Sequence, residues 1–190
     1  MNTYHYEHHD GRKGEGYSIY SAITKALGLE ATILKIADPI WHDQPESEEA
    51  MKIYVASSWR NLIQPGIVTM LRRCGHEVYD FRNPAPDQHG FSWREIEPDW
   101  ENWTPEQYRK ALEHPIAKAG FDLDMNALKS CDACVLVLPS GRSASFEFGW
   151  AIGAGKKGAV VMFDKCEPEL MYLGNPILTN PNDLFDWAGL

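Results

Sequence analysis

Apolar positions in the second half of the chain form short blocks separated by polar turns. The block 132–138 is apolar except at Asp132, which is typical of a parallel strand covered on both faces. A polar turn at 139–143 follows, and we expect Ser143 to cap a helix whose first turn includes Glu147. In an open α/β sheet, ligands bind between the end of a strand and the start of the next helix. This turn therefore predicts a binding crevice.

The same alternation of strand and helix runs from residue 51 to the end of the chain. Strands are expected at 52–56, 76–81, 132–138, 157–163 and 177–179, and helices at 62–74, 106–113, 116–130, 144–155, 167–173 and 182–187. This order predicts an α/β fold, with a doubly wound (Rossmann/flavodoxin-like) parallel sheet of four or five strands flanked by helices. Its crossover connections should be right-handed.

Two parts of the chain depart from this alternation. Residues 1–50 are predicted to form an N-terminal extension, made of a flexible tail, a short helix near 17–29 and a linker, before the α/β domain at 51–190. Residues 82–104 are rich in proline and aromatic residues. A loop of this length predicts either a cover over the site or a small satellite core.

Composition narrows the possible partners and compartment. The 190 residues carry a net charge of −9 without a long basic run, which argues against binding to a nucleic-acid polymer or an anionic membrane. The sequence lacks a signal peptide and an apolar run long enough to span a membrane, so we expect a cytoplasmic protein. Cys131 and Cys134 form a C-x-x-C pair without a second ligand pair, so we expect structural thiols and no metal site.

Three side chains suggest chemistry at the predicted crevice. Glu147 lies near a helix N-terminus, where the helix dipole should keep it ionised. Asp124, in the preceding helix, and Tyr54, in the first strand, could face it. Two carboxyl groups beside a phenol suit cleavage of a glycosidic bond, in which one attacks the anomeric carbon and the other protonates the leaving group. The alternatives are that Glu147 only complements the dipole, that Asp124 is a solvated helix residue and that Tyr54 is a core tyrosine.

Three sequence blocks resemble the nucleoside 2-deoxyribosyltransferase family, which includes the 2'-deoxynucleoside 5'-phosphate N-hydrolases. The first strand and turn read KIYVASSWRN, the middle segment reads DMNALKSCDACVLVLP, and the glutamate helix reads SASFEFGWAIGAGK. The resemblance covers residues 51–179, about two thirds of the chain. Residues 1–50 and the tryptophan-rich segment lie outside it.

The resemblance implies a retaining mechanism and a role for each matching residue. Glu147 corresponds to the nucleophile, Tyr54 to the tyrosine that positions it, and Asp124 to the acid that protonates the departing base. Trp59 falls where the transferases have an aromatic residue near the base. The resemblance also implies that no metal or organic cofactor is required, and that the protein is a homodimer or larger homo-oligomer with sites completed across subunits.

The second turn departs from the transferases. Gly141 stands where they carry a sugar-binding aspartate, and hydroxyl and guanidinium groups surround it: Ser58, Arg60, Ser140, Arg142 and Ser143. A pocket with these donors and without the acid suits a 5'-phosphate better than a 5'-hydroxyl group. We therefore predict a nucleoside 5'-monophosphate substrate, and hydrolysis over base exchange. Surface salt bridges are the alternative role for the two arginines.

Two other functions remain open from the sequence. The first is a non-catalytic nucleotide sensor on the same fold, and the second is a glycohydrolase of the NAD type. The related phosphoribohydrolases carry a G-G-x-G-T-x-x-E signature that is absent here. The glycines and alanines of 144–155 are expected to allow close approach of another backbone, from the sheet or from a second copy of the chain.

Overall fold

The computed structural model describes residues 5–7, 13–15, 50–85 and 88–189, and the chain divides into two compact units, Met1–Glu46 and Ser47–Leu190. In the first unit, β1 (His5–Glu7) pairs antiparallel with β2 (Lys13–Glu15), which differs from the tail expected for these residues. The predicted helix near 17–29 and most of the predicted linker lie outside the described residues. The boundary at residue 50 stays a prediction.

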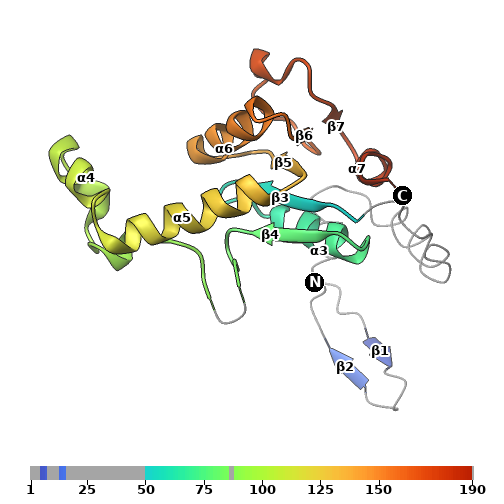
Figure 1. The fold of residues 1–190 in the computed structure, drawn as a ribbon. Helices are drawn as coiled ribbons and strands as arrows, with labels where there is room; N and C mark the ends of the chain where they lie inside the picture. Colours follow the sequence, from blue (N-terminus) through green and yellow to red (C-terminus); the bar gives the residue numbers. More distant parts are fainter. Residues whose placement is uncertain (1–4, 8–12, 16–49, 86–87, 190) are drawn as a thin grey trace. The chain divides into compact units, whose positions relative to one another are not determined.

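The second unit is built on a five-stranded, wholly parallel sheet with the strand order β4-β3-β5-β6-β7 (Figure 1). The fold class predicted from the sequence is confirmed. The chain moves from β3 outward to β4 on one side and to β5 on the other, so the switch point of the sheet lies between β3 and β5. The strands are β3 (Lys52–Ala56), β4 (Glu77–Asp80), β5 (Ala133–Val137), β6 (Lys157–Val161) and β7 (Ile177–Leu178).

Five helices accompany the sheet, at positions close to those predicted: α3 (Gln64–Arg73), α4 (Pro105–Ala111), α5 (Pro115–Ser130), α6 (Arg142–Gly153) and α7 (Pro181–Ala188). The helix predicted at 167–173 is wrong in extent, because only a single 3-10 turn, η3 (Leu170–Tyr172), forms there. Pro168 disfavours a helical residue before it, and Glu169 is extended (φ −120°, ψ 128°). Too little chain then remains for an α-helix.

Alternate residues of each strand supply two separate hydrophobic layers. Ile53 and Val55 of β3 face α3 and α7, which we call the α3/α7 face. Tyr54 and Ala56 face α5 and α6, which we call the α5/α6 face. Every residue of β5 is buried, as the unbroken apolar block 132–138 predicts for a strand covered on both sides.

Helices α3 and α6 begin differently. In α3, Pro65 occupies the first turn and Gly75 follows the helix end with φ 86°, a conformation that favours glycine. In α6, the predicted cap at Ser143 is wrong. Gly141 is the N-cap residue and provides no side-chain cap, so Ser143 already lies inside the helix. Glu147 consequently lies in the second helical turn instead of the first.

The tryptophan-rich segment folds against the helices as a satellite core. It contains two 3-10 turns, η1 (Trp93–Glu95) and η2 (Trp100–Asn102). Trp93 makes edge-on contacts with three other rings, at centroid distances of 4.7 to 5.7 Å: Phe91, Trp103 and Tyr108. A Cβ added at Gly120 of α5 would lie 2.9 Å from Phe91, so the segment packs tightly on this helix. These contacts fit the predicted satellite core. The predicted role of a cover stays a prediction, and Gly90 of the same segment lies close to Trp59.

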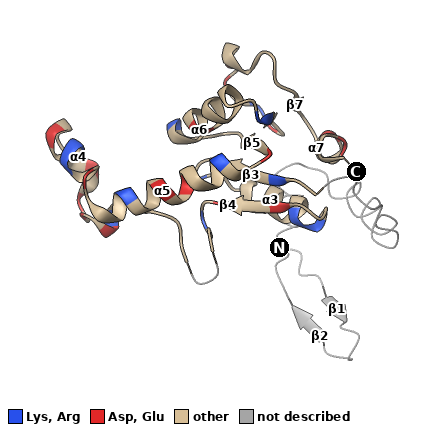
Figure 2. Cartoon of the chain, viewed as in Figure 1, with Lys and Arg blue, Asp and Glu red and all other residues tan. Residues whose placement is uncertain are grey.

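Charged side chains lie mainly on the helices and turns. Figure 2 shows basic and acidic residues interspersed along α4 and α5, which extend beyond the sheet. Across the described residues, each helix is too short or too polar to cross a membrane.

Candidate active site

The two turns at the switch point are joined by buried hydrogen bonds. The Asn61 side-chain amide donates to the carbonyl oxygens of Val137 (3.2 Å) and Pro139 (3.0 Å), while its Oδ1 accepts from the backbone N–H groups at the start of α3. Ser57 Oγ donates to the Val137 carbonyl at 2.8 Å. The turn after β3 is thereby held beside the turn after β5. The two turns therefore lie side by side at the switch point, as predicted, while a binding crevice between them stays a prediction.

Arg82, which follows β4, organises the turn after β3. Its Nη2 donates to three backbone carbonyl oxygens, those of Ser58 (3.0 Å), Trp59 (2.9 Å) and Asn61 (2.8 Å). Its guanidinium group also lies 5.8 Å from the Trp59 ring centroid. These contacts fix the backbone of the turn while leaving the Trp59 side chain 53% exposed and Arg60 exposed.

All the predicted binding residues lie on these two turns or at the start of α6. Ser58, Trp59 and Arg60 follow β3. The second group follows β5 and comprises Ser140, Gly141, Arg142 and Ser143. Within the described residues, neither Arg60 nor Arg142 forms an ion pair with a carboxylate. The alternative role of these arginines in surface salt bridges is therefore not seen in this part of the chain. The α6 N-terminus also presents backbone N–H groups without a side-chain cap.

Glu147 is a partly buried carboxyl group on the α5/α6 face. Burial, and then the negative charge of Asp124, raise the pKa of Glu147 to about 7, although the nearby Tyr54 phenol lowers it. With a pKa of about 7, Glu147 is divided between acid and carboxylate near neutral pH, so the expectation that the helix dipole keeps it ionised holds only in part. Glu147 is beyond the first turn, where the dipole acts most strongly, and desolvation outweighs it.

Asp124 reaches the same region from α5. Burial raises the pKa of its carboxyl group, and the Tyr79 hydroxyl opposes this shift by donating a hydrogen bond of 2.8 Å to Asp124 Oδ1. Asp124 is therefore partly buried and hydrogen-bonded, which argues against the alternative of a solvated helix residue.

Tyr54 lies between the core and the carboxyl groups. Its ring is fully buried and stacks on Tyr79 with centroids 5.1 Å apart and an interplanar angle of 19°. Its hydroxyl approaches Glu147 closely enough to lower that pKa, but their geometry falls short of a standard hydrogen bond in the described structure. Burial, followed by the charges of Glu147 and Asp124, strongly raises the pKa of Tyr54. Tyr54 is therefore a core residue and also a neutral donor beside the carboxyl groups.

Three residues of this arrangement were not singled out from the sequence: Asn61, Tyr79 and Arg82. Tyr79 is directly opposite Tyr54 in the parallel pairing of β3 and β4, and this register is not visible in the sequence. Asn61 and Arg82 act on backbone carbonyl groups far away along the chain. The one available signal was that polar residues follow the ends of β3 and β4, where parallel strands place their turns at a common edge.

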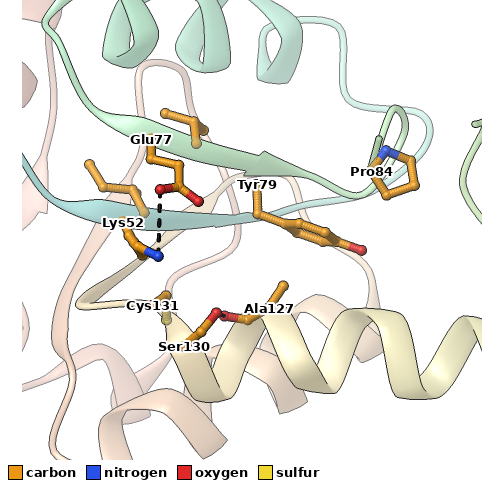
Figure 3. A pocket seen from close by; sticks show the side chains of 9 residues that line it. Lys52, Glu77, Tyr79, Pro84, Ala127, Ser130 and Cys131 are labelled. Carbon is orange, nitrogen blue, oxygen red and sulfur yellow. Dashed lines mark hydrogen bonds and ion pairs between the residues drawn. The ribbon is translucent and has the colours of Figure 1, made fainter. Parts of the chain in front are cut away.

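The cavity found among the described residues is not at the two turns. A hollow of about 150 Å³ opens beside the first residues of β3 and β4, near the Lys52–Glu77 ion pair (Figure 3). The cavity therefore lies away from the two turns that follow β3 and β5. Tyr79 lines this cavity and also donates a hydrogen bond to Asp124, one of the two carboxyl groups of the site. The described residues contain no group of three or more His, Cys, Asp or Glu that could hold a metal ion, and Cys131 and Cys134 are buried free thiols.

Comparison with models of known protein families and with curated protein sequences finds no match to this chain. The chemistry of the site is therefore inferred from its geometry and from the three sequence blocks described above.

Proposed function

We propose that this protein is an N-glycosidase that cleaves the bond between base and sugar in a nucleoside 5'-monophosphate. The observation that carries the proposal is the pair of partly buried carboxyl groups, Glu147 and Asp124, both with raised pKa values, beside the neutral phenol of Tyr54. Partly buried carboxyl groups with perturbed pKa values are typical of acid–base and nucleophilic catalysis. The resemblance to the nucleoside 2-deoxyribosyltransferase family supports the same chemistry.

The proposed reaction proceeds in two steps. The first step requires the state of the pair in which Asp124 holds the proton and Glu147 is a carboxylate. A Glu147 carboxylate oxygen then forms a bond to C1', and the C1'–N bond breaks with its electron pair going to the base nitrogen. Asp124 donates a proton to the departing base. In the second step, water attacks C1', Asp124 accepts a proton from the water, and Glu147 is released from the sugar. Tyr54 stabilises the Glu147 carboxylate before the attack and after its release.

The turns support a phosphate group on the substrate. Backbone N–H groups at a helix N-terminus attract anions, and the α6 N-terminus lacks a side-chain cap. Arg60 and Arg142 supply positive charge beside it without ion-pair partners among the described residues. Because residue 141, the N-cap of α6, is a glycine, it contributes no carboxylate that would repel a phosphate. These features favour a monophosphate over a nucleoside, with Ser58, Ser140 and Ser143 as additional donors and Trp59 beside the base.

The test is to incubate the protein with dCMP, dGMP, CMP and the matching nucleosides, with and without a second free base, and to separate the products by chromatography. We expect free base and sugar phosphate without an added acceptor, and slower turnover of the nucleosides. A faster reaction with the nucleoside would overturn the phosphate preference. Product that forms only with an acceptor would indicate a transferase.

Two further outcomes would replace the proposal. Base release from NAD alone would indicate the NAD-type glycohydrolase. Nucleotide binding, measured by calorimetry, without base release would indicate the non-catalytic sensor. In that case Glu147→Gln should leave nucleotide affinity unchanged.

We also propose a homo-oligomer that contacts through α6. Ala144 and Ala151 pack on the sheet, but a Cβ added at Gly149 or Gly153 would find no described atom within 4 Å. The sheet therefore accounts for the alanines and not for these glycines. Phe146, on the same helix, is 74% exposed. Sedimentation should show a dimer or larger assembly, and a monomer at all concentrations would contradict it.

A further inference from the structure

Tyr79 connects the edge of the sheet to the carboxyl groups of Asp124 and Glu147. It belongs to β4, and its hydroxyl donates to Asp124 Oδ1 at 2.8 Å, a contact that joins residues 45 positions apart. Figure 3 shows its ring lying between β4 and α5, with the hydroxyl extending away from Lys52 and Glu77. One side of this residue therefore borders the cavity, while its polar end is directed to the site.

Two contacts restrict where the Tyr79 hydroxyl can lie. The ring stacks on Tyr54, with centroids 5.1 Å apart, and it lies opposite Tyr54 in the β3–β4 register. Ala127, in the next turn of α5 after Asp124, lines the same cavity as the ring. A hydroxyl held by a sheet position and a stacked ring has few alternative orientations, so it can fix the carboxyl group that accepts from it.

We propose that Tyr79 is a positioning residue for Asp124, which holds Oδ1 by its hydrogen bond and leaves Oδ2 to carry the proton to the departing base. The inference rests on the proposed function, because it assigns Asp124 the role of the acid. Within the described residues, Tyr79 is the hydrogen-bond partner found for Asp124. Oδ2 is then the oxygen available to a ligand.

The same hydrogen bond affects the strength of the acid. A donor to a carboxylate favours its ionised form, and here it opposes the effect of burial on the pKa of Asp124. During the first step Asp124 changes from acid to carboxylate, so the Tyr79 bond becomes stronger as the proton leaves. Tyr79 thereby stabilises the charge that develops on Asp124 in the transition state.

Tyr79→Phe tests this role because it removes the hydroxyl and keeps the stacked ring. We expect kcat to fall about tenfold with KM little changed, since the lost interaction strengthens during the reaction. The limb of the pH–rate profile that reports protonated Asp124 should move to higher pH by about one unit. Tyr108→Phe, a half-exposed tyrosine of α4, is the matched control and should leave the profile unchanged.

A second measurement does not depend on turnover. Carbon-13 NMR of labelled aspartate, with the Asp124 signal assigned from Asp124→Asn, gives the pKa of this carboxyl group directly. We expect a higher pKa in Tyr79→Phe than in the unmodified protein. An unchanged pKa, or an unchanged kcat and pH–rate profile, would overturn the inference.

The two measurements separate failure of the inference from failure of the proposed function. If the unmodified protein releases no base from any substrate, the proposed function fails, together with the acid role assigned here to Asp124. If it releases base and Tyr79→Phe matches it in rate and pH profile, only the role of Tyr79 fails. Equal thermal melting of the two proteins excludes a loss of folding as the cause of a slower reaction.

Discussion

The two faces of the sheet are built from the same strands but have different chemistry. On the α3/α7 face, the buried hydrophobic cluster is aliphatic, as at Ile53, Val55 and Leu71. The buried polar pair beside it, Gln64 and Asp80, is joined by a hydrogen bond. On the α5/α6 face, Tyr54 and Tyr79 lie beneath two carboxyl groups with raised pKa values. Burial of apolar area on the first face stabilises the fold, whereas burial of ionisable groups on the second costs free energy. Under the proposed function, one face maintains the structure and the other performs the reaction.

The largest expected effect is on the α5/α6 face. Glu147→Gln keeps the size of the side chain but removes the nucleophile, so we expect kcat to fall about 10³-fold or more. Base release measured by chromatography checks this, and Glu167→Gln, an exposed residue of the loop before η3, is the matched control. Near-normal activity in Glu147→Gln would remove the catalytic role from this face.

The next effect compares the same cavity-forming change on the two faces. Leu71 and Leu128 are both buried, with exposures of 1% and 0%, but they belong to different faces. Replacement of either by alanine should lower the free energy of unfolding by about 2 to 5 kcal/mol, measured by urea unfolding. Leu71→Ala should leave the activity of the folded fraction unchanged. Leu128→Ala should also reduce activity, because it loosens α5 one turn from Asp124.

A smaller effect tests the cost of the buried carboxyl group. The pKa of Glu147 rises from its ordinary 4.5 to about 7 on folding, so the folded chain holds this proton more tightly than the unfolded chain. The associated stability is present below pH 4.5 and is lost as pH rises through 7. Glu147→Gln should therefore be more stable than the unmodified protein at pH 8 by about 1 to 3 kcal/mol. The difference should shrink toward pH 4.5, and a constant difference would contradict this origin.

The smallest effect concerns the turns at the edge between the two faces. Arg60→Gln should lower kcat/KM for a monophosphate about tenfold, because one charge-assisted contact to phosphate is lost. The corresponding nucleoside should be affected much less. Arg109→Gln, an exposed arginine of α4, is the control. Equal losses for both substrates would show that Arg60 does not select the phosphate.

Much of the fold was predictable because its signals are local. Apolar blocks such as 132–138 predicted the buried strands, and Pro65 and Gly75 marked the limits of α3. The start of α6 was misplaced, because Ser143 is a favourable cap by composition while the chain already turns helical at Arg142. Local preference is a weak guide where a turn is fixed by distant contacts, such as those of Asn61.

The candidate site was predictable only in part. Glu147, Asp124 and Tyr54 were identified from their residue types and from the resemblance of the surrounding blocks. Tyr79 was not, because its position opposite Tyr54 depends on strand register, which is set by tertiary packing. The raised pKa of Glu147 was not predicted, for a related reason. Desolvation depends on which elements cover a side chain, and this is decided only when the helices pack together.

The proposed reaction depends on the register of the short strand β4. It has four residues at the edge of the sheet, and a slip by one position would turn Tyr79 toward the α3/α7 face. Two hydrogen bonds resist such a slip: Gln64 Nε2 donates to Asp80 Oδ1 at 2.9 Å in a buried contact, and Arg72 Nη2 donates to the Val78 carbonyl at 3.0 Å in a partly buried one. A misaligned molecule would retain its helices and much of its core but lose the Tyr79–Asp124 contact. Specific activity would then report the fraction of molecules in the correct register, even in a preparation whose circular dichroism looks native.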